Sequence, residues 1–365
     1  MIHVKDVKKW LLVAAAAVCG ASSAQAAGVS ATIEADRTFL ADADPAVVRV
    51  AIHNDSTRDL YVLRWQTPLN GVQENLFDVR LDGKAVDYTG RLYKRSAPRA
   101  EDYVRIPAGG QIGAEVDLSS VYDMSRTGEY TVRFRANVQD ALSGVGTRIA
   151  DASLREISSN VLSLGVERDE RSRAVQQMAL GSDEDHGIRS TTGNYLTPSY
   201  VSCSSTRQST LVSALSNAQT ISLRARDYLN NLPSTSRSTD AAYKTWFGTY
   251  TSSRYSTVQS HYNNIYSTFT TKTVTFYCDC TDSSYAYVYA NQPYKIHLCS
   301  AFWAAPMTGI DSKAGTLVHE TSHFTVVAGT QDYAYGQSAC KSLAISSPSS
   351  AVMNADSHEY FAETR

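Results

Sequence analysis

The sequence is short of charge. Only 19% of its 365 residues are Asp, Glu, Lys or Arg, and the formal net charge is −2. Without a basic surplus there is no field to hold nucleic acid, and without an acidic surplus there is no sign of a disordered chain. Six cysteines are too few for a disulfide-dense miniprotein. The 43% hydrophobic content instead predicts a folded core, and the length predicts two domains.

The sequence also lacks a hydrophobic run long enough to cross a membrane, which needs about 20 residues. The apolar run 10–18 is shorter than that, follows three lysines and precedes the small-residue pattern Ala24-Gln25-Ala26. These are the parts of a secretory signal peptide, so residues 1–26 are predicted to be removed. The expected location is extracellular, reached through the periplasm, with no membrane or nucleic-acid partner. A bias toward Tyr, with 22 Tyr against 9 Phe, agrees with export.

The mature chain divides into two halves of different character. Residues 27–166 contain alternating segments such as 46–52 and 130–136 with turn signals between them, a pattern that predicts an all-β, immunoglobulin-like sandwich. Residues 167–194 are dense in charge and read as an exposed linker, where 174–180 could form a short helix. Residues 195–365 carry helical spacing over 211–230 and 241–269 and a strand pair within 285–298. They predict an α+β, mostly helical domain.

One motif in the second half carries chemistry. In His319-Glu320-Thr321-Ser322-His323, the two His lie at i and i+4 on one helical face, so both imidazoles can reach one Zn²⁺. Zinc lowers the pKa of a bound water to about 7, and Glu320 lies beside it as the general base. A helix with two exposed or capped histidines is the alternative. The apolar residues that flank the motif argue against it, because a buried His pair needs a partner.

A catalytic zinc needs a third protein ligand. The arrangement His-x-x-Gly-x-x-His is excluded, because no His stands at the required position after His323. The remaining candidates are acidic or His residues downstream, and spacing alone does not choose among them: Asp332, Asp356, His358, Glu359 and Glu363.

A second motif resembles a known family. Gly329-Thr330-Gln331-Asp332-Tyr333-Ala334-Tyr335-Gly336 matches the Gly-Thr-x-Asp-x-x-Tyr-Gly signature of the aspzincins, the deuterolysin and peptidyl-Lys zinc endopeptidases. The resemblance implies a zincin-type metalloprotease domain with one Zn²⁺ held by His319, His323 and Asp332. It also implies that Tyr335 donates a hydrogen bond to the oxyanion of the reaction. The whole chain resembles secreted bacterial members that are made as precursors, one of them a toxin with a part in virulence.

The same resemblance extends to the C-terminal helix and to the cysteines. Asp356 and Glu359 match the two acidic residues with which peptidyl-Lys members receive a Lys side chain in the S1′ pocket. Their i, i+3 spacing lets both hold one ammonium group. The family often has Tyr where this chain has His358. The resemblance further implies the disulfides Cys203–Cys278 and Cys280–Cys299, which leave Cys340 unpaired. A zinc–thiolate site at Cys278-Asp279-Cys280 is the alternative.

The β half then reads as a propeptide, because an active endopeptidase would attack the cell that makes it. We expect the sandwich to act as an intramolecular inhibitor that covers the zinc cleft, with Lys94 as the plug. Lys94 lies in a predicted loop that is suited to an acidic S1′ pocket. No lysine occurs between Lys94 and Lys244. A strictly Lys-directed enzyme therefore cannot cut its own linker, which offers Arg168, Arg171, Arg173 and Arg189 instead.

The predicted function is a secreted zinc endopeptidase that acts on proteins and peptides and prefers Lys, or also Arg, at P1′. Two alternatives remain open at this point. One is a secreted adhesin or binding module with a structural zinc site, and the other is an aspzincin with the broader specificity of the deuterolysins.

Overall fold

The computed structural model of the chain describes residues 28–139, 154–169 and 197–365. The predicted signal peptide and most of the predicted linker, including the possible helix at 174–180, lie outside these ranges. No helix within the described residues is long and apolar enough to span a membrane.

In the described residues of the N-terminal half, the regular elements are strands and three short 3-10 helices, and the strands agree with the alternating pattern. Segments predicted at 46–52 and 130–136 form β3 and β10, and buried residues alternate with half-buried or exposed ones along β1 and β3. The strands are β1 (Val29–Glu34), β2 (Phe39–Ala41), β3 (Val47–Asn54), β4 (Leu60–Leu63), β5 (Phe77–Leu81), β6 (Lys84–Ala85), β7 (Arg91–Lys94), β8 (Tyr103–Ile106), β9 (Gln111–Asp117), β10 (Gly128–Gln139), β11 (Leu154–Ser158) and β12 (Leu162–Glu167); the 3-10 helices are η1 (Arg64–Gln66), η2 (Ala100–Asp102) and η3 (Leu118–Ser120).

These strands form sheets that pack around a buried apolar core. One sheet has the order β1-β3-β9, a second has the order β2-β12-β10-β5-β6 with β11 on β10, and β4 pairs with β8. All these pairs are antiparallel except β2 with β12. An immunoglobulin-like topology remains a prediction.

The last strand runs through Glu167, and Arg168 is buried with its guanidinium donating to the carbonyls of Met124 and Asp42.

The C-terminal half is mostly helical, as predicted. The region 241–269 forms two helices rather than one, because Gly248 takes a positive φ of 78° and Thr251 caps the second helix. The helices are α2 (Ser205–Asn231), α3 (Ala241–Phe247), α4 (Ser252–Thr271), α5 (Ser300–Ala304), α6 (Lys313–His323), α7 (Gln337–Ser346), α8 (Pro348–Ala351) and α9 (Ala355–Glu363). The strands are β13 (Ser199–Val201), β14 (Thr275–Tyr277), β15 (Ala286–Tyr289) and β16 (Lys295–Leu298), the last two forming the predicted strand pair.

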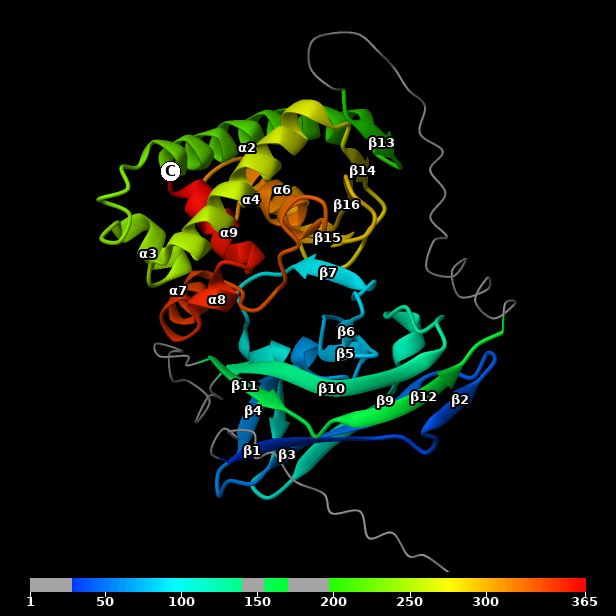
Figure 1. Cartoon of the computed structure of the whole chain (residues 1–365). Helices are drawn as coiled ribbons and strands as arrows, with labels where there is room; N and C mark the ends of the chain where they lie inside the picture. Colours follow the sequence, from blue (N-terminus) through cyan, green and yellow to red (C-terminus); the bar gives the residue numbers. More distant parts are fainter. Residues whose placement is uncertain (1–27, 140–153, 170–196) are drawn as a thin grey trace, which may run out of the picture.

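The two halves share a sheet, which the sequence did not predict. Its order is β13-β14-β16-β15-β7, so a strand of the N-terminal half pairs antiparallel with β15 and closes the edge of the C-terminal sheet. Figure 1 shows β7 lying away from the sandwich, beneath β15 and the helices. The prediction of a loop at Lys94 is therefore wrong. Main-chain pairing with β15 makes the segment a strand, and Lys94 is its last residue.

Candidate active site

Helix α6 carries the His-Glu-x-x-His motif through the middle of the C-terminal half. All 11 of its residues are buried, and it packs against α9, α2, β15 and β7. The helix begins at Lys313 and is capped by Ser312, whose hydroxyl accepts a hydrogen bond from Gly315 N in the first turn. Glu363 on α9 in turn accepts hydrogen bonds from the Ser312 amide and hydroxyl. The start of the motif helix is therefore held in position both by its own N-cap and by hydrogen bonds to α9.

The two motif histidines turn the same ring nitrogen toward each other. His323 Nδ1 lies 2.9 Å from the Thr330 carbonyl oxygen, so Nδ1 carries the proton and Nε2 keeps its lone pair. His319 Nδ1 lies 2.9 Å from Asp356 Oδ1, which favours the same tautomer. The two Nε2 atoms are 3.1 Å apart. Two lone pairs at this distance repel each other unless a cation lies between them.

Asp332 completes this cluster. Its Oδ1 lies 3.2 Å from His319 Nε2 and its Oδ2 lies 3.4 Å from His323 Nε2. Ligands about 2.0–2.1 Å from a tetrahedral zinc lie about 3.3 Å from one another, so the three spacings fit one zinc ion. Among the described residues, Asp332 Oδ1 is also buried without a hydrogen-bond partner. The His₂Asp set therefore fits a catalytic zinc.

The other predicted ligand candidates lie elsewhere. Asp356 and Glu359 face the Nδ1 side of His319, away from the Nε2 pair. His358 pairs with His261 through a 3.0 Å contact between ring nitrogens, and burial lowers the pKa of His358 to about 3. Glu363 binds Ser312, as described above. The structure thus separates Asp332 from the four alternatives that sequence spacing left open.

Glu320 lies beside the cluster and is fully buried. Its Oε1 accepts a hydrogen bond of 3.1 Å from the Lys94 main-chain N–H, while Oε2 has no hydrogen-bond partner within the part of the chain that is described. Burial away from water raises the pKa of Glu320 well above its usual range. A carboxylate with one free oxygen and a raised proton affinity is suited to taking up and returning a proton.

Tyr335 lies in the loop that follows Asp332. Its side chain is buried, packs edge-on against Trp65 and donates a 2.8 Å hydrogen bond to Glu74 Oε1. Both Trp65 and Glu74 belong to the N-terminal half. Burial raises the pKa of Glu74 well above its usual range. Nothing in the sequence marks Glu74, since it stands alone in a segment without a motif.

A pocket next to the His pair holds the ammonium group of Lys94. The side chain is fully buried, and Nζ lies 3.0 Å from Asp356 Oδ1, 2.9 Å from Glu359 Oε2 and 3.2 Å from Asp311 Oδ1. Burial alone would lower the pKa of Lys94, but the carboxylates of Asp356 and Glu359 outweigh it and raise that pKa well above its usual range. Asp311 has no motif signal in the sequence.

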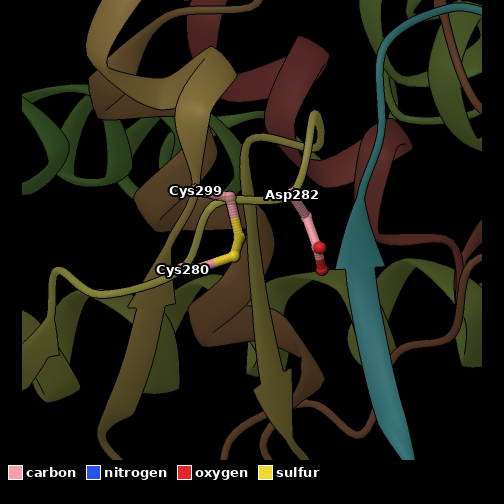
Figure 2. A group of neighbouring side chains, drawn as sticks. All are labelled: Cys280, Asp282 and Cys299. Atoms are coloured by element: carbon pink, nitrogen blue, oxygen red, sulfur yellow. A yellow bond between two sulfur atoms is a disulfide. The ribbon is translucent and has the colours of Figure 1, made fainter.

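The cysteines form the two disulfides that the resemblance implies, Cys203–Cys278 and Cys280–Cys299, and Cys340 is free and buried. Asp282 lies close to the second bond, so these three side chains have the types that a metal site requires. Figure 2 shows the sulfur–sulfur bond between Cys280 and Cys299 and the Asp282 carboxylate pointing toward β7. Oxidised cysteines offer no thiolate, which removes the zinc–thiolate alternative.

Several known proteins have sequences similar to this chain. The sequence model of the lysine-specific metallo-endopeptidase family, Aspzincin M35, matches residues 232–363. An extracellular protease of Aeromonas hydrophila is 36% identical over 321 residues, which are 88% of each chain. A peptidyl-Lys metalloendopeptidase of Armillaria mellea is 53% identical over 167 residues, or 45% of this chain and 46% of that one. A solved zinc peptidase from Grifola frondosa is 51% identical, covering 44% of this chain and 97% of that one with a TM-score of 0.42.

The match to the Aeromonas protease extends over both halves of the chain, and the match to the family model includes the helix with the two His, Asp332 and the acidic pocket. The chain belongs to the aspzincin family and is a zinc-dependent metalloendopeptidase.

Proposed function

We propose that this protein is secreted as an inactive precursor and that, once activated, it cleaves peptide bonds on the N-terminal side of lysine. The observation that carries the proposal is the buried ammonium of Lys94 among Asp311, Asp356 and Glu359. The same contacts support a lysine-binding S1′ pocket and an N-terminal domain that fills it. Two disulfides and the extracellular protease among its relatives support export through the periplasm. A part in virulence stays a prediction.

Strand β7 lies in the cleft as a substrate would. It pairs antiparallel with the edge strand β15, which is how an extended peptide adds to a sheet. Lys94 then occupies the P1′ position. Its main-chain N–H donates to Glu320 Oε1, so the Lys94 nitrogen lies where the nitrogen of the cleaved peptide bond would lie. The preceding amide, Tyr93 N, donates to Asp332 Oδ2. Both the predicted base and a predicted zinc ligand are therefore engaged by the propeptide main chain.

The reaction follows from these positions. Zinc held by His319, His323 and Asp332 would supply Lewis acidity and a water of lowered pKa. Glu320 takes one proton from the attacking water and delivers a proton to the P1′ nitrogen as the carbon–nitrogen bond breaks. Tyr335 donates a hydrogen bond from its hydroxyl to the oxygen of the former carbonyl while that oxygen carries negative charge, and it keeps its proton. In the precursor, the Tyr335 hydroxyl instead donates its hydrogen bond to Glu74 Oε1.

Cleavage-site mapping tests the proposed specificity. We expect the activated enzyme to cut a denatured protein before lysines, to lose activity with a zinc chelator and to regain it with Zn²⁺. Membership of an endopeptidase family sets aside the binding-module alternative, but the broader specificity of the deuterolysins makes a different prediction. Cuts distributed without regard to the P1′ residue would contradict a lysine pocket.

Removing the Tyr335 hydroxyl tests its role in the reaction. We expect Tyr335→Phe to lower kcat about 10²- to 10³-fold, the usual cost of losing one oxyanion donor, with little change in KM. Zinc content should stay at the wild-type level. Tyr333→Phe is the matched control. It also removes a tyrosine hydroxyl, two residues before Tyr335, and we assign Tyr333 no catalytic role. Equal kcat in Tyr335→Phe and the wild type would remove Tyr335 from the mechanism.

A further inference from the structure

Three carboxylates surround one nitrogen atom in the pocket. Asp311, Asp356 and Glu359 place one oxygen each between 2.9 and 3.2 Å from Lys94 Nζ. We propose that Asp311 is a specificity-determining residue of the S1′ pocket and that this three-carboxylate arrangement selects lysine over arginine. This inference rests on the proposed function, because it takes Lys94 as the stand-in for a substrate lysine.

Asp311 is held in place by the helix that carries the other two acidic residues. It lies just before α6 with a positive φ of 52°, and its main-chain N–H donates to Glu363 Oε2. Tyr360, the residue after Glu359, donates a 2.7 Å hydrogen bond to Asp311 Oδ1. The Asp311 side chain is 32% exposed, whereas those of Asp356 and Glu359 are fully buried. Asp311 therefore forms the rim of the pocket.

The arrangement matches an ammonium group and not a guanidinium group. An ammonium concentrates its charge and its three N–H donors on one atom, and in this pocket Asp311 and Asp356 each accept a hydrogen bond from that atom while the Glu359 carboxylate forms an ion pair with it at 2.9 Å. The rings of Tyr285 and Tyr360 lie 5.6 and 5.2 Å from the same nitrogen. A guanidinium spreads five donors over a rigid plane and prefers two parallel bonds to one carboxylate. In this pocket some of its donors would be buried without acceptors, which costs binding.

Lysine selectivity has a consequence for activation. Residues 95–243 contain no lysine, so the enzyme would not cut its own linker. Of the arginines available there, Arg168 is also buried, in hydrogen bonds to carbonyls of the sandwich. A second protease must then release the N-terminal half.

The test uses enzyme activated from the full precursor and two peptides that differ only in Lys or Arg at P1′. We expect the wild type to have a kcat/KM at least about tenfold higher for Lys than for Arg. Asp311→Asn should lower kcat/KM for Lys about 10- to 100-fold and that for Arg much less, so the Lys/Arg ratio falls. Asp282→Asn is the matched control. Its carboxylate also points toward β7, but Lys94 pairs with the other three acidic residues.

Each outcome is decisive. A Lys/Arg ratio near one in the wild type, or an unchanged ratio in Asp311→Asn, would overturn the inference. A wild type that does not distinguish basic from neutral P1′ residues is a different result, because it would remove the lysine pocket itself. Should the Asp311 variant not fold, Lys94→Arg in a Glu320→Gln precursor measures the same preference. Its unfolding temperature should fall below that of the Lys94 precursor, and an equal or higher value would overturn the inference.

Discussion

Replacing Lys94 by methionine should raise the peptidase activity of the uncut precursor above that of the uncut wild type. Methionine keeps much of the side-chain length and removes the charge, so the carboxylates of Asp311, Asp356 and Glu359 would face one another without a cation. Removing one partner of a buried ion pair costs about 3–5 kcal/mol. Since 1.4 kcal/mol is a factor of ten, we expect the fraction of precursor with an open cleft to rise by a factor between about 10² and about 4 × 10³.

The measurement is the initial rate on a lysine-containing peptide, with a gel to show that the linker is intact. Lys84→Met is the control, because Lys84 is an exposed lysine of β6 in the same half. We expect a rate below that of the processed enzyme, since the β7–β15 pairing and the Glu74–Tyr335 bond remain. If the Lys94 variant is no more active than the uncut wild type, Lys94 does not close the cleft.

Replacing Glu320 by glutamine should lower kcat of the activated enzyme about 10²- to 10⁴-fold, the range for losing a general acid–base group. Glutamine has nearly the same shape, but its amide cannot take up and return a proton. Zinc content should not change, because His319, His323 and Asp332 are intact. Asp227→Asn on α2, which removes a carboxylate from a partly exposed pair with Arg226, is the control for protein quality. A variant that keeps a tenth of wild-type activity or more would contradict the role of Glu320.

The same variant separates self-activation from activation by another protease. With no lysine in 95–243, we expect the Glu320→Gln precursor to be cut at the same linker position as the wild type when both are made in the native host. N-terminal sequencing of the secreted product checks this. A linker that stays uncut only in the variant would show that the enzyme cuts it and that its pocket accepts arginine.

Much of the zinc site could be predicted from the sequence because it depends on local periodicity. The i, i+4 spacing of His319 and His323 fixes their common face once the segment is helical, and the structure shows that helix as α6. Asp356 and Glu359 follow the same logic on α9. Asp332 was different. Spacing left it among five candidates, and only the resemblance to a family singled it out before the geometry did.

Other parts of the site could not be read in this way. Asp311 and Glu74 stand in segments without a motif. Asp311 lies just before α6 and meets the acidic helix α9 across 49 residues, and Glu74 meets Tyr335 across 261 residues. Lys94 looked like a loop residue, because the partner that makes its segment a strand is β15, nearly 200 residues later in the chain. Main-chain pairing at a sheet edge depends on which other strand the fold places beside that edge. The side chains of the segment itself do not specify that partner.

The sequence by itself determined a zinc-binding helix, a family and a division into a β half and a helical half. The tertiary structure decided that the two halves share one sheet and that the N-terminal half reaches Lys94 into the pocket of the other. The physical reason is the sequence distance over which the interactions act. Helical periodicity places side chains relative to one another within one element, so it can be read from a short segment. The burial of an ammonium among three carboxylates depends on elements that meet only when the whole chain packs.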